Sequence, residues 1–287
     1  MTSLPSLPFA GQGEIPTEAA MVQAGRDGAF TGKSDRLAVE EPLEMRLATD
    51  AAPSTLSITM RTPGHDFELV AGFLLAEGIV DTRAQILDIA YCVAEDARPE
   101  QRFNVVTVVL DGAPGRASVE RLVMTSSACG ICGTASIEAL RLAGHPSFGP
   151  GPFFDFGLLA SFPDRLRAGQ RAFTETGGVH GIALLDATGE VLCLREDVGR
   201  HNAVDKVVGW AMLQGLLPLS ETALMVSGRI SFEIVQKAAR AGIPVVAAVS
   251  AATSLAVRLA EETGMTLVGF LRGGNCTIYS GRERILP

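Results

Sequence analysis

The second half of the chain alternates short apolar segments with helical segments, and this regularity constrains the fold more than any other feature. Strands are predicted at about 180–186, 190–195, 223–227, 243–249 and 266–271, and helices at about 202–214, 231–241 and 254–263. Gly242 and Gly264 each follow a helical segment, where a left-handed cap is typical. The repeated β-α-β order predicts a mostly parallel sheet with helices on both faces, that is, a three-layer αβα domain.

The first half predicts a smaller α+β subdomain. Apolar residues alternate over 37–47 and again over 56–60, with a turn at 50–53, which indicates a hairpin. Asp66 is expected to cap a helix that runs through Leu75 and stops at Gly78. The remaining predicted elements are strands at about 86–91, 103–110 and 118–124.

Three segments follow from these patterns. Residues 1–34 are rich in Gly, Pro, Ala and Ser without a sustained period, which favours a disordered tail. The α+β subdomain covers 35–125, and the α/β domain covers 126–287. A further helical stretch, at about 156–173, precedes the first strand of that domain.

Composition narrows the class of protein. The chain has 24 Lys and Arg against 32 Asp and Glu, a net charge of −8, which argues against nucleic acid as a partner. No apolar run has the length of a membrane span, and the N-terminus lacks the pattern of a signal peptide. Five cysteines in a chain this large favour reduced thiols. We therefore expect a cytoplasmic protein without a membrane segment.

Cys129 and Cys132 are the most chemically suggestive pair in the sequence. Each is followed by a glycine, and an apolar segment at 135–143 that reads as a helix comes next. A structural zinc site needs two more ligands at matching spacing, which the sequence does not offer. Dithiol–disulfide exchange and persulfide relay both suit such a pair. A helix start and nearby cations favour a thiolate, and Cys129, farther out on the turn, is the better nucleophile.

Three small polar loops follow predicted strands: 227–229, 250–253 and 272–275. Ligands of such sheets bind beyond the carboxyl ends of the strands. Two of the loops carry an arginine, Arg229 and Arg272, and arginine forks beside helix starts suit phosphate oxygens. The alternative is that Gly and Ser are simply what short loops use. Three such loops on one edge favour the ligand site.

The densest polar cluster is 195–202, with the sequence Arg-Glu-Asp-Val-Gly-Arg-His-Asn. His201 suits an acid or a base, and Arg200 suits an anion. An equally good interpretation is a network that caps the following helix and fixes the loop. His180, which opens a strand after two glycines, is interpreted as a structural histidine unless it faces the cysteine turn.

Taken together, these motifs resemble the FdhD family of formate dehydrogenase accessory sulfurtransferases. The resemblance rests on the cysteine turn 127–133, on 176–180, on 195–206, on 227–229 and on 241–244, 253–256 and 269–273. It runs from about Arg36 to the C-terminus. Ala252 departs from the proline expected in the family, which should alter loop stiffness more than chemistry.

The resemblance implies a specific sulfur relay. A cysteine desulfurase would supply sulfur as a persulfide on Cys129, with Cys132 assisting. The sulfur would pass to the molybdenum bis(molybdopterin guanine dinucleotide) cofactor, bound as a substrate, before that cofactor enters the formate dehydrogenase apoprotein. The cofactor would contact Phe270, Leu271, Arg272, Gly273, Gly274 and Asn275, and Arg229 lies on the neighbouring loop. The resemblance also implies a cytidine-deaminase-like larger domain, a homodimer and no permanently bound metal.

Two other functions remain as alternatives. In one, the chain is a cofactor-binding chaperone whose cysteines only contact the molybdenum centre. In the other, it is a zinc nucleoside deaminase. That enzyme class needs His-x-Glu or Cys-x-Glu and Pro-Cys-x-x-Cys. Ala128 precedes Cys129, and His180 is followed by Gly181 and Ile182, so the sequence disfavours it.

Overall fold

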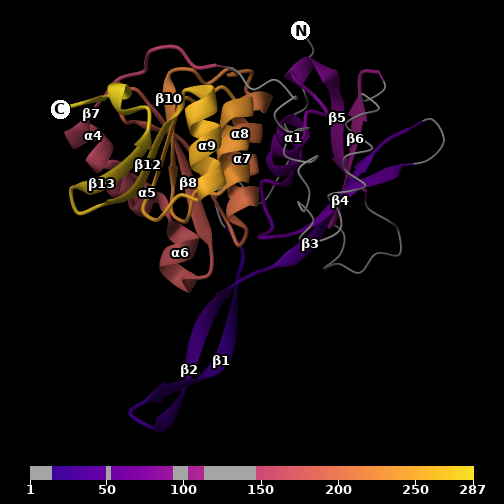
Figure 1. The fold of residues 1–287 in the computed structure, drawn as a ribbon. Coiled ribbons are helices and arrows are strands. Elements are labelled where there is room, and N and C mark those ends of the chain that lie inside the picture. The colour runs from indigo at the N-terminus through magenta and orange to yellow at the C-terminus, as the bar shows by residue number, and fades with distance from the viewer. Residues whose placement is uncertain (1–14, 50–52, 93–102, 113–146) are drawn as a thin grey trace.

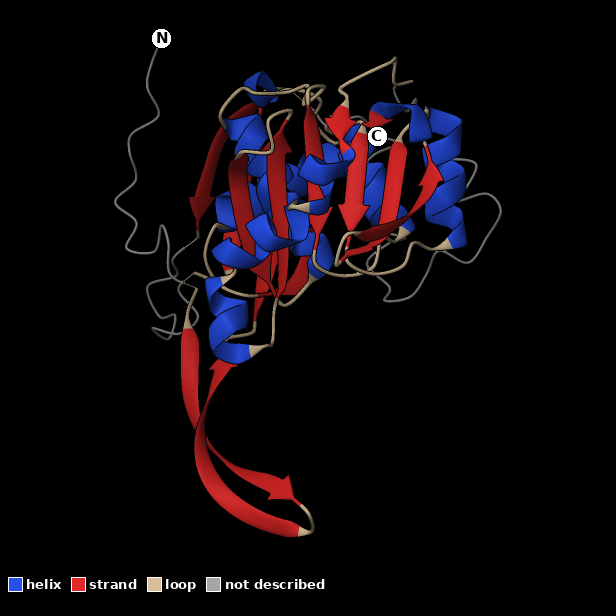
Figure 2. Ribbon diagram, turned by 90° about the vertical axis from the view of Figure 1, so that its left-hand side faces the viewer, coloured by secondary structure: helices blue, strands red, loops and turns tan. Residues whose placement is uncertain are grey.

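The computed structural model describes residues 15–49, 53–92, 103–112 and 147–287. The predicted cysteine turn, the strand at 118–124 and the helix at 135–143 lie outside these ranges, as does most of the turn at 50–53. The described chain forms a larger unit, a smaller unit and a protruding hairpin, shown from two sides in Figures 1 and 2.

The larger unit is built on a six-stranded sheet with the order β13-β12-β11-β10-β8-β9. Its strands are β8 (His180–Asp186), β9 (Val191–Asp197), β10 (Thr222–Val226), β11 (Val245–Ala248), β12 (Thr266–Arg272) and β13 (Asn275–Ser280). Only β10, β11 and β12 pair in parallel. The prediction of a mostly parallel sheet was therefore wrong. Tight turns join β8 to β9 and β12 to β13, and such turns force antiparallel pairing.

Helices cover both faces of this sheet, as predicted (Figure 1). One face packs against α7 (Arg200–Leu213), α8 (Phe232–Arg240) and α9 (Ser254–Thr263), and the other against α4 (Phe156–Ala160) and α5 (Phe162–Gly169). In β8, Ile182 and Leu184 join the first core, whereas Ala183 and Leu185 join the second. This alternation is what a strand buried on both faces requires. The short strands β7 (Phe154–Asp155) and β14 (Ile285–Leu286) pair beside the second core.

The smaller unit is a four-stranded sheet with the order β4-β3-β6-β5, covered by α1 (Asp66–Ala76). Its strands are β3 (Glu41–Leu47), β4 (Ser54–Arg61), β5 (Ile86–Tyr91) and β6 (Val105–Leu110), and a 3₁₀ turn at Arg83–Gln85 precedes β5. The predicted hairpin and helix are confirmed. The helix cap is a correction: His65, with a left-handed φ of 57°, holds the cap position. Asp66 instead binds Arg61.

The two units meet where α1 crosses α7. Gly72 and Gly209 allow the two backbones to approach. A Cβ on Gly209 would lie 1.8 Å from the carbonyl oxygen of Glu68, and a Cβ on Gly72 would lie 2.0 Å from that of Asp205. No other residue type fits at these positions without moving the helices apart, so the relative placement of the two units depends on this contact.

A long hairpin, β1 (Thr17–Arg26) and β2 (Ala29–Ala38), projects from the base of the molecule (Figure 2). The prediction of a disordered tail was wrong for this segment, and residues 1–14 lie outside the described chain. Asp27 and Gly28 form the turn with φ of 51° and 81°, the geometry that Asp-Gly favours in tight hairpins. The hairpin sequence lacks an alternating apolar pattern because neither of its faces is buried in a core. Even Met21 and Phe30 are about three quarters exposed, at 78% and 74%.

Among the described residues, the main contact of the hairpin with the larger unit lies near its base. There β2 packs against α6 (Arg171–Thr176), and Arg36 forms an ion pair with Glu175 at 3.4 Å. Among the described residues, no helix combines the length and apolarity of a membrane span.

Candidate functional site

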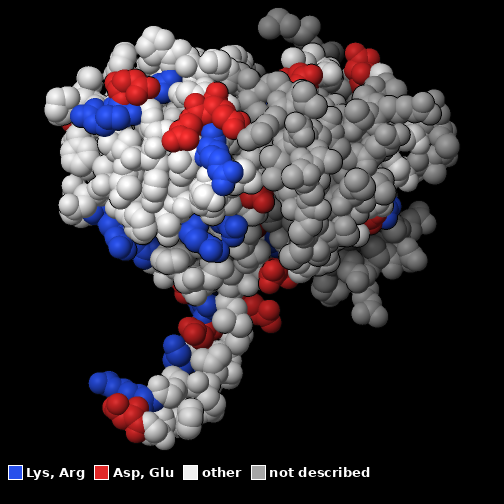
Figure 3. Space-filling view, in the orientation of Figure 1, with Lys and Arg blue, Asp and Glu red and all other residues white. Residues whose placement is uncertain are grey.

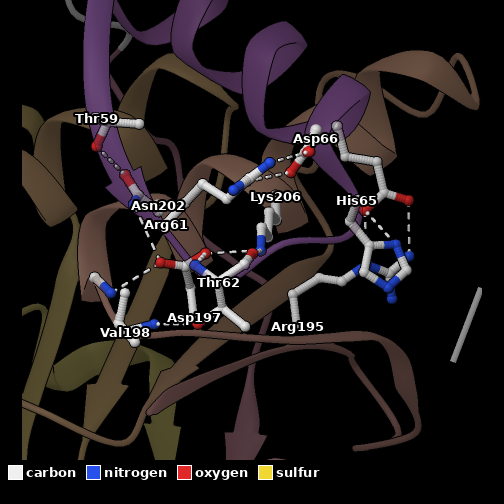
Figure 4. Close-up of polar contacts among 12 residues, drawn as sticks. Thr59, Arg61, Thr62, His65, Asp66, Arg195, Asp197, Val198, Asn202 and Lys206 are labelled. Atoms are coloured by element: carbon white, nitrogen blue, oxygen red, sulfur yellow. Dashed lines mark hydrogen bonds and ion pairs between the residues drawn. The ribbon is translucent and has the colours of Figure 1, made fainter. Parts of the chain in front are cut away.

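The first part of the 195–202 cluster joins the two units rather than facing a ligand. Asp197 is fully buried and forms an ion pair with Lys206 at 2.7 Å. Its two carboxylate oxygens also accept hydrogen bonds from the backbone N–H of Thr62 and Gly199 and from the side chain of Asn202 (Figure 4). A buried carboxylate needs this degree of compensation. These contacts fix the loop, as the structural interpretation expected, but α7 has no side-chain cap at Gly199.

Neighbouring residues of the cluster have similar structural roles. Glu196 accepts hydrogen bonds from the backbone N–H of Ala172 and Phe173, at the start of α6. Arg195 makes a two-pronged contact with Glu68 of α1, at 2.6 and 2.8 Å. Burial opposes ionisation of Glu68, but the contacts with Arg195 and His65 together lower the pKa of this carboxyl.

The three predicted loops lie together at one edge of the large sheet. The backbone N–H of Ile230 donates to Ala251 at 3.0 Å, and that of Thr253 donates to Ile230 at 3.0 Å. The N–H of Phe270 donates to Ser250 at 3.0 Å. Backbone hydrogen bonds therefore tie the loops after β10 and β11 to each other, and tie the loop after β11 to the end of β12. In Figure 3, Lys and Arg side chains lie along the corresponding lower margin of the larger unit.

The third loop differs from its prediction. No further element was predicted after it, but Gly273 and Gly274, with φ of 55° and 74°, turn the chain directly into β13. Arg272 therefore has no helix start behind it. Its guanidinium carbon lies 6.0 Å from the ring centre of Phe270, whose φ of 52° is rare for a bulky residue.

The predicted cofactor contacts at 270–275 fall into two groups, exposed residues and one buried residue. Arg272, Gly273, Gly274, Asn275 and Phe270 are exposed. Leu271 is fully buried in the second core, so its side chain packs rather than faces solvent. Asn275 turns its amide toward the carbonyl oxygen of Gly273 at 3.0 Å, which stabilises the turn.

The second part of the 195–202 cluster faces the same edge. His201 Nε2 lies 3.0 Å from the Ser231 hydroxyl and 3.6 Å from a Glu233 carboxylate oxygen at the start of α8. Burial and the neighbouring Arg200 lower the pKa of His201 to about 4. Burial, Arg200 and Arg229 likewise lower the pKa of His180. Both imidazoles are therefore neutral at pH 7. The sequence did not indicate that His180 and Arg200 would meet here, because His180 opens β8 whereas Arg200 begins α7.

The two predicted catalytic residues, Cys129 and Cys132, lie outside the described residues. Of the three described cysteines, Cys193 is buried, and burial raises the pKa of its thiol to about 12. Cys276 is partly buried and Cys92 is exposed. The described residues contain no group of three or more His, Cys, Asp or Glu side chains placed to hold a metal ion.

Comparison with protein-family models gives a match that includes the residues described above. The model of the FdhD/NarQ family matches residues 38–286. The chain belongs to the FdhD/NarQ family. The match includes both units and all three loops of the strand-end edge, whereas β1 lies before it.

Individual FdhD relatives match over nearly the full length. The sulfur carrier protein FdhD of Streptomyces avermitilis is 51% identical over 275 residues, which is 94% of this chain and 95% of the relative. The protein of the same name from Mycobacterium tuberculosis is 48% identical over 261 residues, covering 88% and 92%. A crystal structure assigned as a formate dehydrogenase accessory protein from Desulfotalea psychrophila aligns with a TM-score of 0.72 and 26% identity, over 94% and 99% of the two chains.

Proposed function

We propose that this FdhD-family chain is a sulfur carrier in the maturation of formate dehydrogenase. It accepts sulfur from a cysteine desulfurase on Cys129 and passes it to the molybdenum bis(molybdopterin guanine dinucleotide) cofactor before the cofactor enters the enzyme. The observation that carries the proposal is the family match over residues 38–286, together with relatives named sulfur carrier protein FdhD. The strand-end edge supplies a physical reason for a large anionic ligand.

The loading step is a thiol–persulfide exchange. The Cys129 thiolate attacks the outer sulfur of the desulfurase persulfide, a new S–S bond forms on Cys129, and the desulfurase thiolate leaves. No external oxidant or reductant is needed, because one S–S bond replaces another. Cys132 assists by protecting the persulfide or by helping its release. The other cysteines suit this role less well; Cys193, with its raised pKa, remains a buried thiol.

The acceptor is a substrate with several phosphate groups and two guanine nucleotides. Arg272 and the exposed backbone of the β12–β13 turn are available to it on one side of the edge. Arg229 is available on the loop after β10. Guanidinium forks bind phosphate oxygens in a two-pronged geometry. We expect the larger domain to share the cytidine-deaminase fold and the protein to act as a homodimer.

Intact mass spectrometry tests the loading step. The protein is incubated with a cysteine desulfurase and cysteine, and a mass gain of one or more sulfur atoms is expected. The gain should be lost in Cys129→Ala and kept in Cys92→Ala, a matched control because Cys92 is exposed but outside the cysteine turn. A wild-type protein that gains no sulfur would favour the second candidate, a chaperone that binds the cofactor without covalent relay.

A further inference from the structure

The hairpin of β1 and β2 has no core of its own. Within the described residues 17–38, no strand residue is buried. Met21 and Phe30 are the two most exposed large hydrophobic side chains of the described chain. A two-stranded hairpin is at best marginally stable in water by itself, whereas three or more strands support one another. The hairpin is therefore suited to docking against another strand.

The outer edge of β1 is open for such pairing. In the described sheets β1 pairs only with β2, in a continuous register from Thr17↔Ala38 to Arg26↔Ala29. Natural proteins protect free edges with lysine, proline or a β-bulge. The described β1 contains neither lysine nor proline, and its pairing has no register shift. Its edge thus has the regularity that edge-to-edge pairing needs.

The charge of the hairpin limits the kind of partner. Residues 17–38 hold three acidic and three basic side chains, so this segment is neutral in a chain of net charge −8. A neutral segment has no electrostatic preference for nucleic acid or an acidic membrane surface. Two copies of the chain repel each other through their net charge, and a neutral segment is where they approach with least repulsion. The hairpin suits a second copy of this chain.

The sequence of β1 is complementary to itself in antiparallel pairing. Side chains alternate between the two faces of a strand, so one face of β1 carries Glu18, Ala20, Val22, Ala24 and Arg26. When two copies pair about Val22, Glu18 of each copy lies opposite Arg26 of the other, and the small apolar residues lie opposite one another. Opposite charges in such cross-strand pairs are stabilising, and like charges are destabilising.

The other contacts of this register are compatible with it. Arg26 lies 3.6 Å from Asp27 in the single chain, but the two side chains are 94% and 92% exposed, and such a pair adds little stability. Arg26 is therefore available to a second copy. On the opposite face, Met21 lies opposite Gln23 of the other copy and diagonal to its Met21, within the reach of long side chains.

We propose that two copies of the chain associate through antiparallel pairing of their β1 strands about Val22, which forms one four-stranded sheet across a two-fold axis. The interface is isologous, because each copy contributes the same edge. All but the last residue of the hairpin precede the family match, which begins at residue 38, so the inference concerns assembly and not sulfur chemistry. It names a surface for the homodimer of the proposed function and rests on the proposed function in that respect alone.

Sedimentation velocity of the full-length protein over a range of concentrations tests the pairing. Arg26→Glu and Glu18→Arg each place like charges opposite one another twice in the dimer. Each should raise the dimer dissociation constant by about tenfold or more. Lys33→Glu is the matched control, because it makes the same charge change as Arg26→Glu on β2, away from the paired edge. All three positions are exposed, so the unfolding midpoint should stay unchanged.

Mixing the two weakened variants separates pairing between copies from effects within one hairpin. A Glu18→Arg copy and an Arg26→Glu copy have opposite charges at both contacts, so their mixture should dimerise as tightly as the wild type. Val22→Cys should form a disulfide-linked dimer on mild oxidation, identified by its linked peptide, because directly opposite residues lie within reach of the bond. Thr31→Cys, on β2, should not.

Two results would overturn the β1 pairing. A wild-type protein that is monomeric throughout the concentration range would do so, and the hairpin would then be assigned to a different protein partner. A dimer that neither charge reversal weakens would do so as well, and would place the homodimer interface elsewhere. Sulfur loading on Cys129 is measured by intact mass and not by oligomeric state, so its failure is distinguishable from failure of the pairing.

Discussion

Arg195 and Arg200 belong to one short polar cluster, yet they have opposite environments. Arg195 makes a two-pronged contact with Glu68 and holds α1 against the larger unit. Arg200 has a buried Nε without a partner and lies beside Gly228 at the strand-end edge. Residues of this one cluster thus have two roles: Arg195, Asp197 and Asn202 join the units, and Arg200 and His201 face the ligand edge. A dense polar motif need not have one function.

The largest expected effect is a loss of folding stability when a residue that joins the two units is replaced. Asp197→Ala leaves Lys206 buried without its carboxylate and removes an acceptor from Thr62. The free energy of unfolding should fall by about 3–5 kcal/mol, as when one partner of a buried ion pair is removed. Urea denaturation measures this. Arg229→Gln, on the ligand half, should change stability by less than about 0.5 kcal/mol. Equal losses of unfolding free energy in the two variants would contradict the proposed division between residues that join the units and residues at the ligand edge.

A substitution at the α1–α7 contact should lower the stability nearly as much. Gly209→Ala places a methyl group 1.8 Å from the Glu68 carbonyl oxygen, so the helices must separate. We expect a loss of at least about 1–3 kcal/mol, the usual cost of overpacking. Gly178→Ala is the control, because its Cβ would lie at an ordinary 3.4 Å from Ala38. A stable Gly209→Ala protein would show that the helices adapt easily.

A smaller effect is expected for ligand binding at the turn. Arg272→Ala should weaken GDP binding by about tenfold, or roughly 1.4 kcal/mol, without lowering the unfolding midpoint. Calorimetric titration measures the affinity and thermal unfolding measures the midpoint. The exposed Lys33→Ala serves as the charge-matched control. Unchanged affinity in Arg272→Ala would remove the β12–β13 turn from the ligand edge.

A further effect is a pH dependence on the ligand half. Burial, followed by the charge of Arg200, lowers the pKa of His201 to about 4, from about 6.5 in the unfolded chain. The folded state therefore binds fewer protons in this range. His201 contributes stability that is complete above pH 6.5 and is lost as the pH falls toward 4. His201→Gln should flatten the stability profile over that window. An unaltered slope would show that His201 titrates normally.

Much of the fold was predictable because periodicity reports burial. The apolar runs 223–227 and 243–249 predicted β10 and β11, and the helix at 66–75 was placed within a residue or two of α1. The relative direction of neighbouring strands was less predictable, because the sequence of an apolar strand is the same whether it pairs parallel or antiparallel. The hairpin at Thr17–Arg26 and Ala29–Ala38 was missed because its exposed faces carry no period.

The ligand edge was only partly predictable. The loops at 227–229 and 250–253 were placed correctly at one edge because they follow parallel strands. The meeting of His180 and Arg200 depends on the antiparallel pairing of β8 with β9, which local sequence does not reveal. The side chain of Leu271 was included among the cofactor contacts, although strand alternation turns it into the core. The roles of Cys129 and Cys132 stay predictions.

The most direct test of the sulfur carrier follows the sulfur from the protein to its acceptor. Protein loaded on Cys129 is mixed with the molybdenum bis(guanine dinucleotide) cofactor, and its intact mass is recorded over time. We predict that the added sulfur mass disappears in the wild type and disappears more slowly in Arg272→Ala, while Lys33→Ala behaves as the wild type. A persulfide that survives the cofactor in the wild-type protein would contradict the proposed transfer.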